Sequence, residues 1–206
     1  MANKSLLSQR FRGFYPVVID LETGGFDAKK NPILELAAVM IHMDEEGFLS
    51  VGETLHYHVE PFAGSKMETS ALEFTGIKPH NPFRFARDEK EAITELFAAI
   101  KKQVRAHDCK RAVMVAHNAV FDQSFLQAAV KRYHLDNDPF HKFTTFDTAA
   151  LSGLAFGQTV LARAAEAAGF AFDKDSAHSA KYDAEITAQL FCHIVNKWRD
   201  LGGWPL

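Results

Sequence analysis

The chain lacks most of the features that would assign it to a specialised class of protein. It has two cysteines among its 206 residues, Cys109 and Cys192, which are too few and too unpatterned for a disulfide framework or a zinc site. It has no apolar run of membrane-spanning length, and its first residues, MANKSLLSQR, lack the apolar core of a secretory signal. We therefore expect a soluble, cytoplasmic protein that is not associated with a membrane.

Internal boundaries are missing as well. No stretch rich in proline, glycine or serine divides the sequence, and no repeat or heptad pattern is present. Hydrophobic residues make up 47% of the chain, which is enough for one domain with its own core. We predict a single domain over residues 1–206.

A net basic charge is also lacking, because the formal charge at pH 7 is −3. Many nucleic-acid-binding domains are basic overall, so binding of that kind would need a local patch. Candidates for such a patch are four arginines, Arg10, Arg12, Arg105 and Arg111. The alternative is that the cations near Arg105 are simply the solvent-exposed face of an amphipathic helix.

Against these absences stand four acidic residues in three separated segments. Asp20 and Glu22 lie in VVIDLETGG, at the end of an apolar, β-branched run that predicts a buried strand. Because residues i and i+2 of a strand point to the same face, the two carboxylates project together. Such a pair suits a hard divalent cation, Mg²⁺ or Mn²⁺, which prefers oxygen ligands. Taken alone, the pattern is more typical of a surface pair at a strand end.

The second segment, RAVMVAHNAVFD, predicts another buried strand followed by a helix, with Asn118 as the helix N-cap. Asp122 then lies in the first turn of this helix and faces the carboxyl ends of the strands. An acidic residue at a helix start can also serve only to compensate the helix dipole, so this segment is weak by itself.

The third segment, HSAKYD, contains His178 and Asp183. Five residues apart on one helix they would face different ways, so we expect His178 in a loop and Asp183 at the start of a helix. Apolar residues at helical spacing follow, namely Ile186, Leu190, Ile194 and Trp198. A loop histidine beside carboxylates can accept a proton from water at neutral pH. Most other histidines are interpreted as surface or strand-face residues without a role, including His56, His58, His80, His134 and His141.

The order of the expected elements favours an α/β fold. Strands are expected at about 14–21, 33–43, 54–60, 111–117 and 142–147, and helices near 68–75, 89–107, 119–134, 148–168 and 183–200. Three successive strands followed by alternating helices and strands indicate a mixed five-stranded sheet flanked by helices. Asp147, an acid at the end of the last strand, is expected to be structural, with a possible part in positioning the site.

In combination and in this order, DLETGG, HNAVFD and HSAKYD resemble the three motifs of the DEDD superfamily of exonucleases, in its DEDDh branch. The resemblance covers nearly the whole chain, through FDTAALSGLAFGQTVL to the terminal LGGWPL. It implies a ribonuclease H-like fold and two Mg²⁺ ions, for which Mn²⁺ can substitute, held by Asp20, Glu22, Asp122 and Asp183. It implies that His178 is the general base; whether His178 also touches metal stays open.

The activity implied by the resemblance is that of a 3′-to-5′ exoribonuclease that also degrades single-stranded DNA. Such an enzyme trims the 3′ ends of tRNA and other stable RNA precursors and releases nucleoside 5′-monophosphates. The resemblance further implies a homodimer, in which Arg10, Arg12, Arg105 and Arg111 of one subunit hold RNA that enters the active site of the other. The alternative is a monomer whose arginines are ordinary surface charges.

Phenylalanine is the dominant aromatic residue, with 18 copies against 4 tyrosines and 2 tryptophans. Most should be core, as the helical spacing of Phe97, Phe125 and Phe191 with other apolar residues indicates. By the resemblance, the two terminal bases of the substrate are sandwiched by Phe26, Phe74, Phe121 and Phe143. The alternative is that any one of these rings belongs to the core.

Two positions depart from the family's pattern. A glutamate that discriminates against cytosine is expected four residues before Phe74, where this chain has Ser70. A basic loop residue is expected where this chain has Asp136, followed by Asp138. Base preference and the strength of the RNA-binding patch therefore stay open.

Two other functions stay open at this point. One is a proofreading exonuclease similar to the ε subunit of a DNA polymerase, which we would expect to carry a polymerase-binding tail after LGGWPL, where this sequence shows none. The other is a non-catalytic nucleic-acid-binding module on the same fold. That module would lack a site residue, whereas all five are present here.

Overall fold

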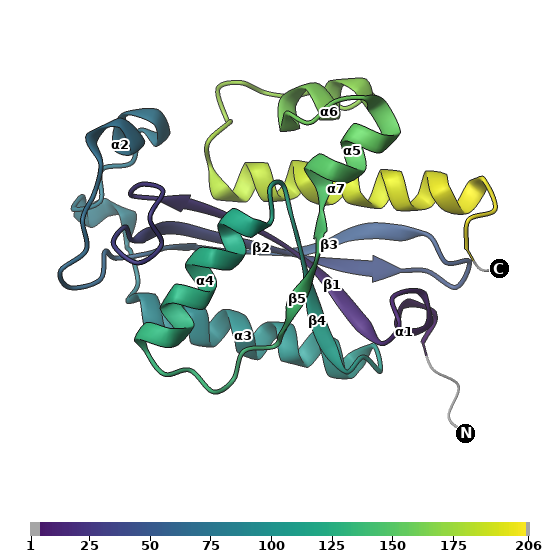
Figure 1. Ribbon diagram of the computed structural model, residues 1–206, viewed down its shortest axis with the longest axis horizontal. Coiled ribbons are helices and arrows are strands. Elements are labelled where there is room, and N and C mark those ends of the chain that lie inside the picture. Colours follow the sequence, from purple (N-terminus) through teal and green to yellow (C-terminus); the bar gives the residue numbers. More distant parts are fainter. Residues whose placement is uncertain (1–4, 205–206) are drawn as a thin grey trace.

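Five strands form one mixed sheet in the order β3-β2-β1-β4-β5 in the computed structural model, which describes residues 5–204 (Figure 1). The strands are β1 (Phe14–Thr23), β2 (Ile33–Met43), β3 (Leu49–His58), β4 (Arg111–Ala116) and β5 (Phe140–Asp147). The first three pair antiparallel, whereas β4 pairs parallel with both β1 and β5. The predicted α/β fold with a mixed five-stranded sheet is confirmed.

Helices cover both faces of this sheet (Figure 1). They are α1 (Leu6–Arg10), α2 (Thr69–Thr75), α3 (Glu89–Ala106), α4 (Val120–Arg132), α5 (Thr148–Phe156), α6 (Leu161–Ala167) and α7 (Ala180–Asp200), with a short 3-10 turn η1 (Pro82–Arg84). Helices α3 and α4 lie on one face, and α7 lies on the other beneath α5 and α6. Among the described residues, no helix has the length and apolar character needed to cross a membrane.

The alternation of side chains along β1 divides the core in two. Val17, Ile19 and Leu21 pack with residues of α3 and α4, whereas Val18 packs with residues of α7. Since side chains alternate along a strand, Asp20 and Glu22 share the face of Val18. The sequence of β1 therefore directs both carboxylates toward α7.

The bounds of three elements differ from those expected by three residues or more. Strand β3 begins at Leu49 rather than near residue 54, and its interior Gly52 hid the pattern. A Cβ on Gly52 would lie 2.6 Å from the His42 ring, so this close approach requires glycine. Gly157, with φ of 66°, ends α5 and divides the expected helix 148–168 in two. Helix α7 begins at Ala180, three residues earlier than expected.

The prediction that Asn118 caps α4 is wrong. Asn118 has a positive φ of 66°, and Ala119 occupies the N-cap position without a side-chain hydrogen bond. The backbone N–H groups of Asn118 and Ala119 instead donate to the Asp147 carboxylate, each at 3.1 Å. Asp147 also accepts from the Ala149 N–H at the start of α5. It thereby ties the end of β5 to the start of α4, the helix that carries Asp122.

Candidate active site

Three carboxylates meet where the end of β1 faces the first turn of α7. Asp20, Glu22 and Asp183 each offer an oxygen, and these oxygens lie within 4.8 Å of one another. Asp183 lies in the first turn of α7, as expected from the apolar spacing that follows it. That spacing fails only late in the helix, where Trp198 is exposed rather than packed against the sheet.

Asp122 lies in the first turn of α4 and is 4% exposed. Its charge raises the pKa values of both Asp20 and Glu22, which places it near the first three carboxylates. Burial raises the pKa of Asp122 itself to about 8, although backbone N–H groups that donate to it offset part of the effect. The fourth predicted carboxylate is therefore beside the other three, but outside their closest cluster.

The carboxyl groups of Asp122 and Asp183 disfavour the ionisation of Asp20 and Glu22. Burial raises the pKa of Glu22 to about 8, and the charges of Asp183, Glu35 and Asp122 act in the same direction. Burial and the charges of Asp122, Asp183 and Glu22 also raise the pKa of Asp20 well above its usual range. A group of carboxylates of this kind is ionised at neutral pH only when cations neutralise it.

The donor set fits a hard divalent cation. All four side chains offer carboxylate oxygens, and no cysteine or histidine nitrogen belongs to the closest cluster. The Oδ1 atom of Asp183 is buried and has no hydrogen-bond partner, which is costly unless something else binds it. A cation among Asp20, Glu22 and Asp183 would provide that partner.

His178 lies in the loop before α7, as expected. Its backbone has a positive φ of 66°, and its N–H donates to Asp183 Oδ2 at 3.2 Å. Its imidazole is exposed and lies 4.1 Å from the ring centroid of Phe74 on α2. The charge of His178 lowers the pKa of Asp183, against the larger effect of burial, which raises it. The imidazole thus lies beside the carboxylates without belonging to their closest cluster.

The phenylalanines fall into two classes. Phe97, Phe125 and Phe191 are at most 2% exposed, as predicted for core rings. In contrast, three of the rings predicted to hold bases are largely exposed, with Phe26 at 80%, Phe74 at 65% and Phe143 at 88%. Phe121 is half-buried, with its ring centroid 4.9 Å from that of Phe125 and 6.1 Å from that of Phe26. Three of the four rings are therefore open to solvent.

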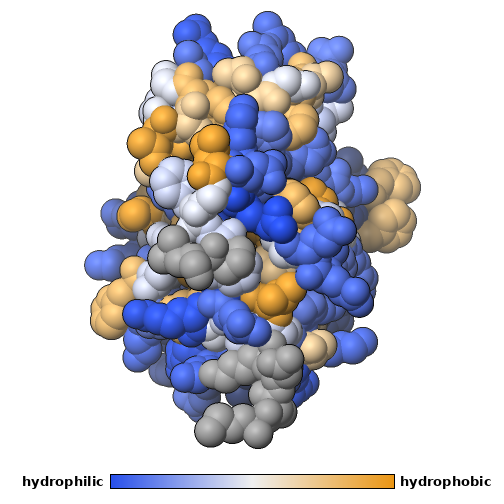
Figure 2. All heavy atoms as spheres, turned by 90° about the vertical axis from the view of Figure 1, so that its right-hand side faces the viewer, coloured by the Kyte–Doolittle hydropathy of each residue, from blue (hydrophilic) through white to orange (hydrophobic). Residues whose placement is uncertain are grey.

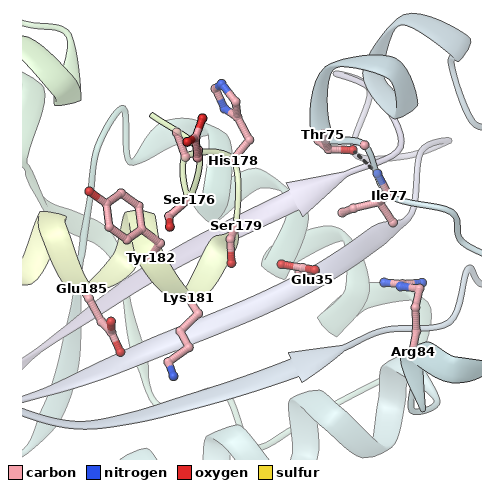
Figure 3. Close-up of a pocket in the computed structure, with 13 residues that line it drawn as sticks. Glu35, Thr75, Ile77, Arg84, Ser176, His178, Ser179, Lys181, Tyr182 and Glu185 are labelled. Atoms are coloured by element: carbon pink, nitrogen blue, oxygen red, sulfur yellow. Dashed lines mark hydrogen bonds between the residues drawn. The ribbon is translucent and has the colours of Figure 1, made fainter. Parts of the chain in front are cut away.

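A cavity of about 610 Å³ lies beside His178, between the end of α2 and the start of α7 (Figure 3). Glu35 of β2 and Arg84 of η1 face each other across it. Glu35 is only 8% exposed, and its Oε2 atom accepts the Ala180 N–H at the start of α7. Neither Glu35 nor Arg84 is among the predicted site residues. The available signal was a lone carboxyl group within the apolar run ILELAAV.

The predicted arginine patch lies at the other end of β1. Arg10 belongs to α1, and Phe14 at the start of β1 pairs with Arg111 at the start of β4. The Arg12 guanidinium lies over the Phe14 ring at 5.4 Å, whereas Arg105 lies in the last turn of α3. Figure 2 shows this end of the molecule, where hydrophilic and hydrophobic residues are mixed. The structure therefore separates the arginines from the carboxylates along the length of β1.

Comparison with known sequences gives one consistent result. The RNase T family model, which is described as an exonuclease, matches residues 17–191. Ribonuclease T of Photorhabdus laumondii subsp. laumondii is 57% identical over 202 residues, which are 98% of this chain and 93% of that protein. Ribonuclease T of Cronobacter sakazakii is 59% identical over 200 residues, which are 97% of this chain and 90% of that protein.

Solved structures show the same fold at much lower identity. E. coli exonuclease I in complex with a dT13 oligonucleotide has a TM-score of 0.70 and 17% identity, and the match covers 93% of this chain and 43% of that chain. The nuclease domain of 3′hExo, a DEDDh family member bound to rAMP, has a TM-score of 0.66 and 17% identity. That match covers 91% of this chain and 92% of the domain. The predicted ribonuclease H-like fold is confirmed.

Proposed function

The chain belongs to the ribonuclease T family of exonucleases, and from this premise we propose how its residues act and on what. The family makes it a hydrolytic 3′-to-5′ exoribonuclease, which favours this function over a proofreading DNA exonuclease or a non-catalytic binding module. We propose that it works in the cytoplasm on the 3′ ends of tRNA and other stable RNA precursors. It also degrades single-stranded DNA and releases nucleoside 5′-monophosphates.

The observation that carries the proposal is the group of buried carboxylates with raised pKa values. Two Mg²⁺ ions, or Mn²⁺ in their place, would be held by Asp20, Glu22, Asp122 and Asp183. When bound, such ions activate a water molecule and stabilise the charge that develops on the leaving oxygen. The unpartnered Oδ1 of Asp183 supports this assignment, because a ligand at that atom removes the cost of burying it.

His178 acts as the general base in this proposal. Its imidazole is exposed, so a water molecule can reach it, and the hydrogen bond from its N–H to Asp183 fixes the loop beside the carboxylates. A loop histidine in this position can accept a proton from the attacking water at neutral pH. The contact with Phe74 links the base to a ring that we assign to the substrate.

The substrate's last two bases stack on Phe26, Phe74, Phe121 and Phe143 in this proposal. Stacking on an aromatic ring contributes about 1 to 3 kcal/mol per base and needs no hydrogen bond to the base edge. The high exposure of three of these rings supports the assignment, because burial does not account for their positions. Phe121 is half-buried and packs between the rings of Phe125 and Phe26.

We further propose a homodimer in which the arginine patch of one subunit serves the active site of the other. The chain carries a net charge of −3, so RNA needs a local basic surface. Arg10, Arg12, Arg105 and Arg111 lie away from the carboxylates within one chain, as described above. A two-fold interface would bring each patch to the opposite site and serve both sites at once.

Release of mononucleotides tests the proposed chemistry. Purified chain is incubated with 3′-labelled tRNA or single-stranded DNA, with Mg²⁺ or with a chelator. We expect Mg²⁺-dependent release from both substrates, and loss of release in Asp20→Asn, which changes charge but not volume. Asp200→Asn, at an exposed position in the last turn of α7, is the matched control and should behave as wild type. Near-normal turnover by folded Asp20→Asn would refute the assignment.

Subunit mixing tests the dimer. Neither Asp20→Asn nor a variant with the four patch arginines replaced should be active alone. In their heterodimer, one site keeps its carboxylates and faces the intact patch of the other subunit, so activity should return. A monomeric sedimentation profile with full activity, or no recovery on mixing, would defeat the proposal of a shared site.

A further inference from the structure

The structure places a second group of metal-ligating side chains on the same face of the sheet, one strand away from the carboxylates. Glu35 of β2 lies directly opposite His58 of β3, and His56 is two residues from His58, so all three side chains point to one face. We propose that Glu35, His56 and His58 form a binding site for a Zn²⁺-class cation, separate from the Mg²⁺ site of the nuclease.

The ligating atoms are already close together. One oxygen of Glu35 and one ring nitrogen each of His56 and His58 lie within 4.8 Å of one another. Individual distances to the carboxylate are 3.4 Å from His56 Nε2 and 3.1 Å from His58 Nδ1. Ligands bound tetrahedrally at about 2 Å from zinc are a little over 3 Å apart, so small side-chain rotations suffice.

His58 carries the second observation. Its Nδ1 atom is buried and has no hydrogen-bond partner, although Glu35 Oε1 is only 3.1 Å away. A nitrogen lone pair and a carboxylate oxygen at this distance repel each other unless a proton or a cation lies between them. Burial also lowers the pKa of His58, which favours the neutral imidazole that binds metal.

The ligand chemistry selects the class of cation. Two imidazoles and one carboxylate form the set that zinc and other borderline transition metals prefer, with a fourth position left open. Mg²⁺ prefers oxygen ligands and seldom binds imidazole. The side chains of His56 and His58 are 23% and 37% exposed, so a cation can reach them from solvent. Glu35, His56 and His58 should therefore retain zinc in an excess of Mg²⁺.

Nearby charges act in both directions. The Arg84 guanidinium faces Glu35 and opposes a cation, but its two terminal nitrogens already donate to the Leu34 and Pro79 carbonyls. On the other side, Glu22 pairs directly with Glu35 across β1 and β2 and adds a further carboxyl group beside the proposed cation. A cation here would also fix Glu35, whose Oε2 accepts the Ala180 N–H that begins α7.

Zinc retention tests the proposal by binding rather than by activity. The chain is dialysed against Zn²⁺ in excess Mg²⁺, and bound zinc is measured by mass spectrometry. We expect one retained Zn²⁺ per chain, and an affinity lower by at least about tenfold in His56→Gln and in His58→Gln. His134→Gln, at an exposed position outside the group, is the matched control and should bind as wild type.

Other outcomes separate this site from the nuclease site. Asp20→Asn should retain zinc, because Asp20 is not a ligand in the proposal; loss of zinc in that variant would mean that zinc binds the nuclease carboxylates and would overturn the proposal. The proposal would also be overturned if the wild-type chain retained no zinc in excess Mg²⁺, or if both histidine variants retained as much zinc as the wild type. If circular dichroism shows that a histidine variant is unfolded, anomalous diffraction at the zinc edge is measured on crystals of the wild-type chain. A zinc peak among Glu35, His56 and His58 would support the proposal, and the absence of a peak there would overturn it.

Discussion

Glu22 and Glu35 lie opposite each other on adjacent strands, and their exposed fractions are nearly equal at 9% and 8%. Their pKa values nevertheless shift in opposite directions. Burial and the charges of three carboxylates raise the pKa of Glu22 to about 8. Burial also acts to raise the pKa of Glu35, but the hydrogen bond from His56 and the charges of His56 and His58 outweigh it, so the pKa is lowered.

The difference shows that the neighbouring groups, rather than the depth of burial, decide in which direction the pKa of a buried carboxyl group shifts. Glu35 finds its partners within the chain, in His56 and His58 on the adjacent strand. Glu22 finds further carboxylates, and among the described residues no lysine, arginine or histidine forms an ion pair with it. The chain therefore stabilises an ionised Glu35 on its own, but an ionised Glu22 only together with bound cations.

Neutralising each glutamate in turn should give the largest effect. Glu22→Gln removes a proposed metal ligand, so turnover should fall by roughly 10³-fold, which corresponds to several kcal/mol. Without metal at pH 8, the same change should raise the free energy of unfolding, because it removes mutual repulsion. Both quantities come from mononucleotide release and chemical denaturation.

Glu35→Gln is the matched substitution and should do the opposite. It removes an ionised group that the histidines stabilise, so the free energy of unfolding at neutral pH should fall by about 1 to 3 kcal/mol. Turnover should fall by no more than about tenfold, through the weaker contact with Ala180. The same response of both variants in both measurements would contradict the distinction between the two glutamates.

Removing the proposed base should lower activity while both glutamates and their neighbours stay intact. His178→Ala should lower kcat by about 10² to 10⁴ while substrate binding is retained, because only the proton acceptor is lost. Added imidazole should restore part of the rate, and binding is measured by fluorescence anisotropy with a single-stranded oligonucleotide. A collapse of binding with unchanged turnover of bound substrate would instead make His178 a binding residue.

Metal removal should make the raised pKa values visible as a pH dependence of stability. Glu22 and Asp122 have folded pKa values of about 8, above the values of about 4 expected when unfolded. Between these limits the folded chain holds more protons than the unfolded chain, so its stability falls as the pH rises. In chelator, the melting temperature should therefore be lower at about pH 8 than at about pH 5.

Mg²⁺ should reverse this loss, because bound cations favour the ionised carboxylates. The rise in melting temperature on adding Mg²⁺ should be larger at about pH 8 than at about pH 5. In Glu22→Gln the pH dependence should be weaker, since one of the shifted groups is gone. A melting temperature that rises with pH in chelator would contradict the raised pKa values.

The smallest expected effect belongs to the exposed rings. Phe26→Ala should weaken binding of a short single strand by about 1 to 3 kcal/mol with no change in melting temperature. Phe125→Ala, in a ring that is 2% exposed, should instead cost about 3 to 5 kcal/mol of stability. A large fall in melting temperature for Phe26→Ala would show that this ring is part of the core.

The sequence predicted what local periodicity determines. Spacing of two along β1 brought Asp20 and Glu22 to one face, and helical spacing put Asp183 in the first turn of α7 with His178 in the loop before it. Contacts between distant segments escaped prediction. The cap of α4 comes from Asp147, more than twenty residues along the chain, and not from the favourable Asn118.

Glu35 escaped prediction for a related reason. Its role depends on the register of β2 against β3, which sets His58 opposite it. The start of β3 was itself misplaced, because Gly52 interrupts the strand pattern and is explained only by its close approach to His42. A lone glutamate in an apolar strand reveals that a partner is needed, but not which residue supplies it.

The claim that cations complete the carboxylate site around Glu22 is tested most directly by anomalous diffraction from crystals of the chain with Mn²⁺ and a nucleoside 5′-monophosphate. We predict two manganese peaks among Asp20, Glu22, Asp122 and Asp183, with one in contact with Asp183 Oδ1. The absence of manganese from these four carboxylates, in crystals of a chain that is active with Mn²⁺ in solution, would contradict it.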